Sequence, residues 1–80
     1  LKFAYILRIT GGVRMEVYTW QARINKGMTL KQLEIATGIG KTTLNNIENG
    51  LVSPTLVQLE AIARALDVTM IELFDSEYKG

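Results

Sequence analysis

Residues 29–50 read TLKQLEIATGIGKTTLNNIENG, and this stretch predicts two short helices joined by a tight turn. Thr29 stands where a helix N-cap belongs, and Gln32 completes a capping box three residues later, so the first helix should begin directly after Thr29. Gly38 should end that helix, because glycine adopts the left-handed conformation of a helix C-terminus without a Cβ clash. A second helix should then begin at about Lys41 and end at the close of the stretch.

The second of these helices has a polar outer face. At 100° per residue, Leu44 and Ile47 fall on one side of the helix and should pack inward. The opposite side, flanked by Lys41, presents Thr42, Asn45, Asn46 and Asn49. Such side chains can donate and accept hydrogen bonds at base edges, and the major groove of DNA admits one α-helix. The stretch therefore predicts a helix-turn-helix, in which the second helix contacts bases and the first crosses the backbone.

From residue 29 to about residue 74 the chain follows a longer pattern. Its elements are Thr29, Leu33, Gly38-Ile39, Leu44, Ile47-Glu48-Asn49-Gly50, Ser53-Pro54-Thr55, Leu66-Asp67-Val68 and Glu72-Leu73-Phe74. In these residues the chain resembles the phage-repressor helix-turn-helix family of the Cro and Xre type. The resemblance implies an all-α, compact five-helix domain like that of lambda repressor, and a repressor-like transcriptional regulator that binds specific sequences in double-stranded DNA. We assign residues 14–76 to this domain, residues 1–13 to an appended N-terminal arm and residues 77–80 to a C-terminal tail.

Two positions depart from the family pattern. The position after Leu33 is usually small, because the two motif helices approach closely there, and in this chain it is Glu34. The stem of Glu34 should therefore turn outward. The first position of the first motif helix often holds a glutamine that touches a phosphate, and here it is Leu30. Any phosphate contact at that position would come from backbone N–H groups at the helix N-terminus.

Three residues are expected, from the resemblance and the helix geometry, to contact bases. Lys41 suits guanine O6 and N7, Asn46 suits adenine N6 and N7 as a bidentate partner, and Thr42 suits a thymine methyl group. Contacts to the DNA backbone or the groove wall are expected from Thr29, Lys31, Gly40, Thr43, Asn45 and Asn49. Such contacts set the register without specifying bases. Three of these residues also have structural roles: Thr29 caps a helix, Lys31 is a solvated surface charge, and Gly40 starts a helix.

Residues 14–26 should form a helix that precedes the motif and ends at Gly27. The apolar residues that recur at the spacing i, i+3, i+7 of an amphipathic helix are Val17, Trp20 and Ile24. The family resemblance implies that Arg23 of this helix forms a partly buried ion pair with Glu48, which falls near the edge of the buried face of its own helix. The role of this pair would be structural, because removing one partner leaves a buried charge without compensation.

Ahead of this helix, residues 3–10 read FAYILRIT and precede Gly11-Gly12. Their aromatic and β-branched side chains predict a strand that ends at a breaker, and this segment has no place in the family pattern. Three interpretations remain open: a β-arm that pairs with the domain or with another chain, a tag or upstream read-through with Met15 as the natural start, and a disordered arm. An unpaired apolar edge of this kind would be prone to association.

Two further helices should complete the domain after Pro54. Thr55 with Gln58, and Thr69 with Glu72, form capping boxes that open them. The apolar residues expected to join the core are Leu56, Leu59, Ile62, Ala63 and Leu66 of the longer helix, and Ile71, Leu73 and Phe74 of the short last one.

The composition restricts the classes of function. The chain of 80 residues contains no cysteine and no histidine, so it lacks thiolate metal ligands and the usual acid/base group at neutral pH. We therefore expect no catalytic site, metal or cofactor. No apolar run approaches the roughly 20 residues that span a bilayer, and no secretory signal is evident, so a cytoplasmic location without membrane contact is expected.

The charges of the chain are unevenly distributed. Residues 1–50 carry seven basic and three acidic side chains, for a net charge of +4. Residues 51–80 carry two basic and five acidic side chains, for a net charge of −3. A domain with one basic and one acidic pole would be oriented toward phosphates, although ordinary solvated surface charge gives the same count.

Two other functions compete with DNA binding. Gly38 to Thr42 resembles the end of a phosphate-binding loop, but that loop needs a glycine at position 35, which is Ile35, and a preceding strand where a helix is expected. A nucleotide cofactor is therefore not expected. The stronger rival is an antitoxin-like or adaptor module on the same fold, in which Trp20 or the N-terminal strand contacts another protein. For the DNA-binding function, a homodimer on a near-palindromic site is expected.

Overall fold

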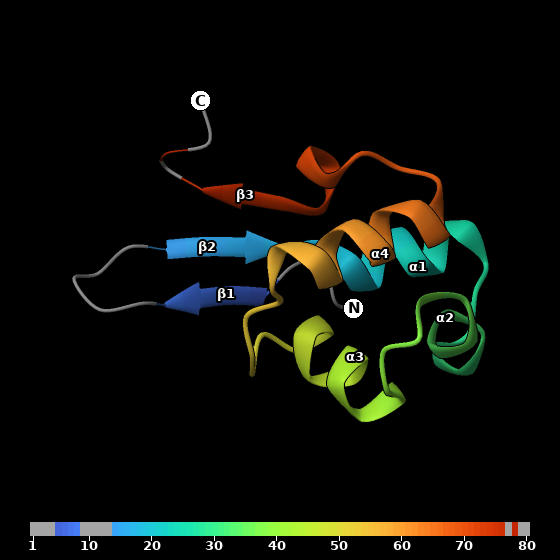
Figure 1. Cartoon of the computed structure of the whole chain (residues 1–80). Coiled ribbons are helices and arrows are strands. Elements are labelled where there is room, and N and C mark those ends of the chain that lie inside the picture. The colour runs from blue at the N-terminus through green and yellow to red at the C-terminus, as the bar shows by residue number, and fades with distance from the viewer. Residues whose placement is uncertain (1–4, 9–13, 77, 79–80) are drawn as a thin grey trace.

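The computed structural model describes residues 5–8, 14–76 and 78 of the chain. Within these residues the α-helices are α1 (Thr19–Lys26), α2 (Leu30–Thr37), α3 (Lys41–Glu48) and α4 (Leu56–Leu66) (Figure 1). The other elements are the strands β1 (Tyr5–Arg8), β2 (Arg14–Val17) and β3 (Phe74–Ser76) and the 3-10 helix η1 (Met70–Leu73). None of these helices has the length and apolar character that crossing a membrane requires.

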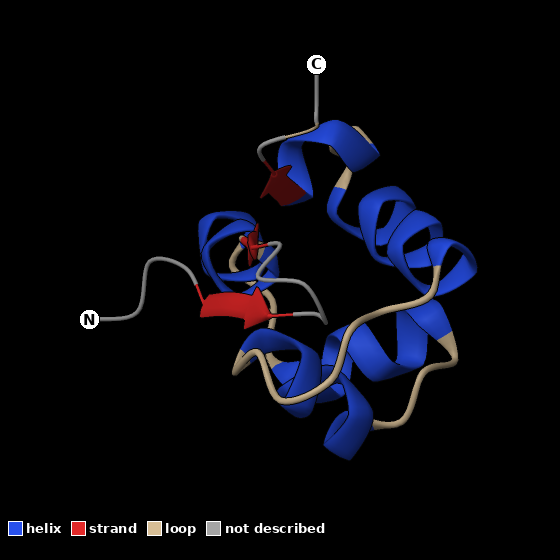
Figure 2. Ribbon diagram, turned by 90° about the vertical axis from the view of Figure 1, so that its left-hand side faces the viewer, coloured by secondary structure: helices blue, strands red, loops and turns tan. Residues whose placement is uncertain are grey.

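The three strands form a small antiparallel sheet in the order β1-β2-β3 at one end of the helical part (Figures 1 and 2). Val17 at the end of β2 is the Cα partner of both Tyr5 and Phe74. The prediction of an all-α domain is therefore wrong, and the domain is mostly helical with a sheet that joins its two ends. The sheet forms because β1 and β3 satisfy the backbone N–H and C=O groups of β2 from both sides.

The predicted N-terminal strand is present as β1, and it pairs with the domain itself. This is the first of the three interpretations of that segment. The rest of the expected arm, residues 1–4 and 9–13, lies outside the described residues, as do residues 77, 79 and 80 of the expected tail.

Helix α1 begins at Thr19, whereas a helix from Arg14 was predicted. The difference arises because residues 14–17 are hydrogen-bonded to two strands, and the N–H of Tyr18 donates to the carbonyl of Leu73 at 2.9 Å. A helix over the same residues would have to give up these bonds to residues far along the chain.

The apolar spacing used to predict that helix did not mark a buried face. Val17 is buried, but in β2, while Trp20 is only half-buried and Ile24 is 45% exposed. The residues that α1 buries are Thr19 and Arg23. A periodic apolar pattern across the end of a strand and the start of a helix therefore imitated a single amphipathic helix.

The two capping boxes predicted before α2 and α4 are confirmed. The hydroxyl of Thr29 accepts a hydrogen bond from the N–H of Gln32 at 3.0 Å, and that of Thr55 accepts one from Gln58 at 3.1 Å. In each box the glutamine side chain accepts in return from the threonine N–H, at 2.9 and 3.0 Å. These reciprocal bonds satisfy N–H groups that have no partner within the helix and so fix where α2 and α4 begin.

The predicted fifth helix is a single 3-10 turn, η1. Its capping box is present, with the N–H of Thr69 donating to Oε2 of Glu72 at 2.6 Å. Phe74 then has φ −152° and ψ 163° and begins β3. The helix stops there because the chain pairs with β2, so the described part of the domain has four α-helices and one 3-10 turn in place of five α-helices.

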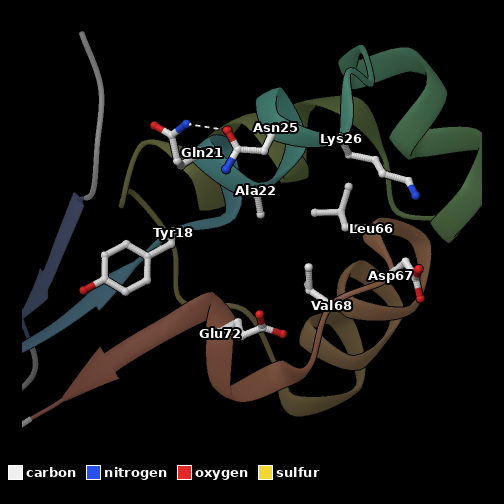
Figure 3. A pocket seen from close by; sticks show the side chains of 9 residues that line it. All are labelled: Tyr18, Gln21, Ala22, Asn25, Lys26, Leu66, Asp67, Val68 and Glu72. Carbon is white, nitrogen blue, oxygen red and sulfur yellow. Dashed lines mark hydrogen bonds between the residues drawn. The ribbon is translucent and has the colours of Figure 1, made fainter.

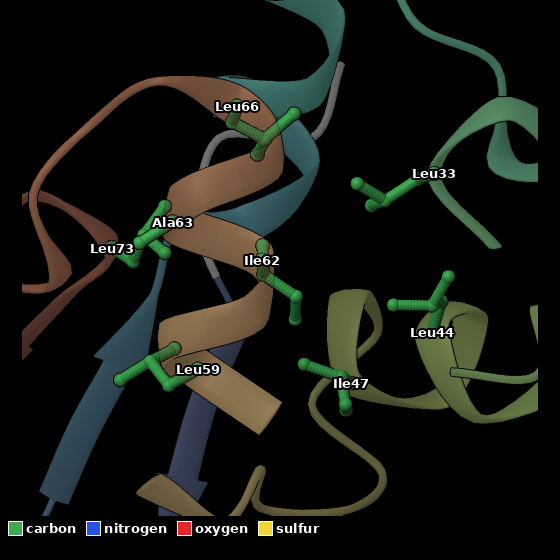
Figure 4. Packing of buried hydrophobic residues seen from close by; sticks show 8 residues of the cluster. All are labelled: Leu33, Leu44, Ile47, Leu59, Ile62, Ala63, Leu66 and Leu73. Carbon is green, nitrogen blue, oxygen red and sulfur yellow. The ribbon is translucent and has the colours of Figure 1, made fainter. Parts of the chain in front are cut away.

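The core lies between α2, α3, α4 and η1 (Figure 4). Its buried apolar side chains are Leu33, Leu44, Ile47, Leu59, Ile62, Ala63, Leu66 and Leu73. Leu56 was expected to join them but is 76% exposed, and it lines a hollow of about 90 Å³ together with Val17, Pro54 and Phe74. The prediction that Ile71 joins the core is also wrong, because this residue is 50% exposed.

Candidate nucleic-acid interface

The turn between α2 and α3 is fixed by local hydrogen bonds. Gly38 has φ +75°, a left-handed conformation that suits glycine, and its N–H donates to the carbonyl of Glu34 at 2.8 Å. The hydroxyl of Thr37 accepts a hydrogen bond from the N–H of Ile39 at 3.1 Å, and Ile39 packs against the core. The turn therefore holds α3 in one orientation relative to α2.

Helix α3 has a sharply divided surface. Leu44 and Ile47 are each 1% exposed and point toward α2 and α4 (Figure 4). Among the residues expected to contact bases, Lys41 and Thr42 are exposed and Asn46 is half-buried. Of the others on this helix and at its end, Asn45 is exposed and Thr43 and Asn49 are half-buried. The helix thus presents polar groups outward over its whole length and buries its apolar side.

Two of the residues expected to contact the DNA backbone, Thr29 and Gly40, are the N-caps of the two motif helices. Both residues are exposed. The hydroxyl of Thr29 is engaged in its capping box, and Gly40 is the N-cap of α3 and has no side chain to cap that helix. Leu30, at the first position of α2, packs against the core, so it offers only its backbone N–H to a phosphate.

Glu34 brings Lys31 and the start of α3 together. Its Oε1 accepts a hydrogen bond from Lys31 Nζ at 3.0 Å, and its Oε2 accepts one from the backbone N–H of Lys41 at 2.8 Å. The stem of Glu34 does turn away from the core, as expected, but the carboxylate then caps the neighbouring helix. Sequence reasoning missed this contact, and the available signal was an acidic residue close before a helix whose N-cap, Gly40, carries no side chain.

The electrostatics around Glu34 follow from these two contacts. The hydrogen bond from the backbone of Lys41, and then that from the Lys31 side chain, hold the pKa of the Glu34 carboxyl below its ordinary value. Glu34 is therefore ionised at neutral pH and places a negative charge at the N-terminus of α3, where it is favourable to the helix dipole. The same charge sits between two lysines expected to face DNA.

Arg23 and Glu48 form a buried ion pair between α1 and α3. Arg23 Nε lies 2.6 Å from Glu48 Oε2, and Arg23 Nη2 lies 3.1 Å from Oε1, so the contact is bidentate. Arg23 Nη1 also donates to the carbonyl of Met28 at 2.8 Å. The side chains are 10% and 2% exposed. This pair links α3 to the helix before the motif, and each charge satisfies the other at a site largely shielded from water.

Two other features of the surface bear on rival functions. The segment from Gly38 to Thr42 follows helix α2, whereas a phosphate-binding loop follows a strand. A pocket of about 420 Å³ opens between α1, the end of α4 and η1 (Figure 3). Its lining residues include Tyr18, Lys26 and Asp67, and none belongs to α2 or α3.

Comparisons with known proteins agree with this geometry. The family model "Helix-turn-helix" matches residues 21–73. Over 56 residues, 69% of this chain, the sequence is 36% identical to the HTH-type transcriptional regulator SlrR of Bacillus subtilis (strain 168), of which the match covers 37%. Over 51 residues, 64% of this chain, it is 35% identical to the uncharacterized HTH-type transcriptional regulator y4dJ of Sinorhizobium fredii (strain NBRC 101917 / NGR234), of which it covers 66%. The chain thus spans less than two thirds of these curated relatives. No solved structure gives a significant match.

Proposed function

The chain belongs to the helix-turn-helix family of the Cro and Xre type, and we propose that it regulates transcription by binding a specific sequence in double-stranded DNA. The observation that carries this proposal is the division of α3. Its apolar side, Leu44 and Ile47, is sealed into the core, and its polar side faces out. A short helix of this kind, supported by others and with Lys41, Thr42 and Asn45 exposed, fits the major groove.

In the proposed complex α3 lies in the major groove and three side chains contact base edges. Lys41 donates to guanine O6 and N7, and Asn46 forms a bidentate pair with adenine N6 and N7. Thr42 places its methyl group against that of thymine. Lys41 and Thr42 are at the first turn of α3 and Asn46 follows one turn later, which is the spacing that lets one helix follow successive bases.

The contacts to the DNA backbone or the groove wall come from the start of α2, from the turn and from α3. We assign them to Thr29, Lys31, Gly40, Thr43, Asn45 and Asn49. Lys31 is 69% exposed, so its side chain can move from Glu34 to a phosphate at little cost, since exposed ion pairs are weak. These contacts hold the register of α3, and the buried pair of Arg23 and Glu48 holds its orientation from behind.

A two-fold dimer would let two copies of α3 bind a near-palindromic site. The half-sites would then lie about one helical turn of DNA apart. One domain contacts few bases, because α3 is short. Two copies therefore raise both the affinity and the length of DNA sequence that is recognised.

The decisive experiment is selection of bound sequences from a random pool of duplex DNA, followed by titration of the selected site at several salt concentrations. We expect one enriched motif and an affinity that falls steeply with salt, because bound cations are released from the phosphates. Selection without enrichment, at low as well as moderate salt, would contradict the proposal. It would favour the alternative of an antitoxin-like or adaptor module whose partner is a protein.

A further inference from the structure

The outer face of α4 borders a shallow groove of about 380 Å³ that it shares with α2. The groove is lined by Ala36, Val57, Glu60, Ala61, Arg64 and Ala65. Val57 is 80% exposed. Three of the other lining residues are alanines, so the floor of the groove is apolar and shallow enough for a helix backbone to approach closely.

The α4 members of this set stand at positions 57, 60, 61, 64 and 65. This is the spacing i, i+3, i+4, i+7, i+8 of a helix face that packs against another helix. The chain's own core lies on the other side of α4, where Leu59, Ile62, Ala63 and Leu66 are buried. Helix α4 therefore has two faces with the spacing of a packed helix, and the described residues bury only one of them.

Two opposite charges lie on the outer face, one helical turn apart. Glu60 and Arg64 are both exposed. A glutamate four residues before an arginine can pair with it along a helix. In this structure, however, neither side chain has an ion-pair or hydrogen-bond partner among residues 5–8, 14–76 and 78. The face thus offers one free acid and one free base.

We propose that a second copy of this chain occupies the groove, with the two α4 helices antiparallel about a two-fold axis near Ala61. Antiparallel pairing reverses the order of the charges, so Glu60 of each copy meets Arg64 of the other. Val57 of each copy packs over the alanines of the other, large side chain onto small. A two-fold interface must be complementary to itself, and this arrangement of charge and size meets that condition.

This interface rests on the two-fold dimer of the proposed function and names the surface that forms it. The groove shares none of the residues assigned to DNA contact. The alternative of an unrelated partner protein at this face does not explain why the charge pattern is complementary to itself. Glu60 and Arg64 are both exposed, so substitutions of these two charged side chains should leave the folded chain intact.

The test is a charge exchange followed by sedimentation over a concentration series without DNA. The wild-type chain should sediment as a dimer at high concentration. Glu60→Arg and Arg64→Glu should each raise the dimer dissociation constant about tenfold or more, because each creates two like-charge contacts across the axis. The double variant Glu60→Arg/Arg64→Glu should restore dimerisation, which a merely structural defect would not allow.

Lys26→Glu supplies the control, since it changes the charge by the same amount as Arg64→Glu on an exposed residue of α1 outside the groove. It should sediment as the wild type does. A wild-type chain that stays monomeric at every concentration, single variants that dimerise normally, or a double variant that stays dissociated would each overturn the interface. A wild-type dimer that enriches no DNA would overturn the proposed function and leave the interface standing, whereas a monomer that enriches a motif would do the reverse.

Discussion

The Glu34 carboxylate on α2 caps the N-terminus of α3 through the backbone N–H of Lys41, at a distance of 2.8 Å. This contact does for α3 what the hydroxyls of Thr29 and Thr55 do for α2 and α4. It differs in that the capping group comes from the neighbouring helix. The cap therefore stabilises the start of α3 and its angle to α2 together, and the first of the proposed base contacts, Lys41, depends on both.

The Glu34 cap should make the stability of the domain depend on pH in a defined way. The pKa of Glu34 in the folded chain lies below its ordinary value of 4.5. The ionised carboxylate therefore stabilises the fold above pH 4.5, and this stabilisation is lost as the pH falls through the lowered pKa. Urea unfolding of the wild type and Glu34→Gln should show a difference in free energy that is constant at neutral pH and shrinks on acidification.

Glu34→Ala should be less stable than Glu34→Gln at neutral pH, because glutamine keeps an oxygen that can accept from the Lys41 N–H. Other carboxyl groups titrate equally in the wild type and the glutamine variant, so their effects cancel in the difference. A difference that stays the same from neutral pH to well below pH 4.5 would show that the charge of Glu34 does not stabilise the fold.

The Arg23 and Glu48 pair should be costly to break from one side. Replacing Glu48 by leucine leaves the Arg23 charge buried without a partner and should lower the free energy of unfolding by about 3–5 kcal/mol. The double variant Arg23→Met/Glu48→Leu should recover much of this loss, because it buries no charge. Urea unfolding measures both, with Lys26→Ala, at an exposed position of α1 outside the proposed dimer interface, as the control. A double variant no more stable than the single one would show that the pair stabilises by shape rather than by charge.

Asn46 and Lys31 should affect DNA binding in different ways. Asn46→Ala should cost roughly 1–3 kcal/mol on the selected site and relax the preference at one base position. Lys31→Ala should weaken binding to every sequence alike and lower the salt slope by about one. Titration of the selected site and of its single-base variants, at two salt concentrations, separates these results. An Asn46→Ala variant with unchanged affinity and preference would remove Asn46 from the base contacts.

Thr19 offers a stabilising substitution. Its hydroxyl is buried in α1 and has no hydrogen-bond partner among the described residues. Thr19→Val keeps the branched shape and removes the unsatisfied group, so it should raise the free energy of unfolding by up to about 1 kcal/mol.

Thr37→Val is the matched comparison for Thr19→Val. The hydroxyl of Thr37 donates to the Leu33 carbonyl at 2.7 Å and accepts from the N–H of Ile39 at 3.1 Å. The same substitution should therefore destabilise the chain by about 1 kcal/mol or more at this position. Equal effects of the two substitutions in urea unfolding would mean that the Thr19 hydroxyl has a partner in solution.

The sequence alone determined the motif and its two faces. The capping boxes of Thr29 and Thr55 act over three residues, and Gly38 acts on its own conformation, so each is encoded locally. The burial of Leu44 and Ile47 opposite exposed Thr42 follows from the helical repeat once the helix is placed. The base-contact assignments stay predictions, because they depend on a DNA partner.

Only the tertiary structure decided what happens at the two ends of the domain and at the start of α3. Residues 14–17 form a strand because residues 74–76 and 5–8 supply hydrogen-bond partners on both sides, and no pattern within 14–26 signals partners so distant. The same pairing ends η1 at Leu73. Glu34 caps α3 because the turn brings its carboxylate to the Lys41 N–H. No helical or strand periodicity predicts a contact between residues at this spacing.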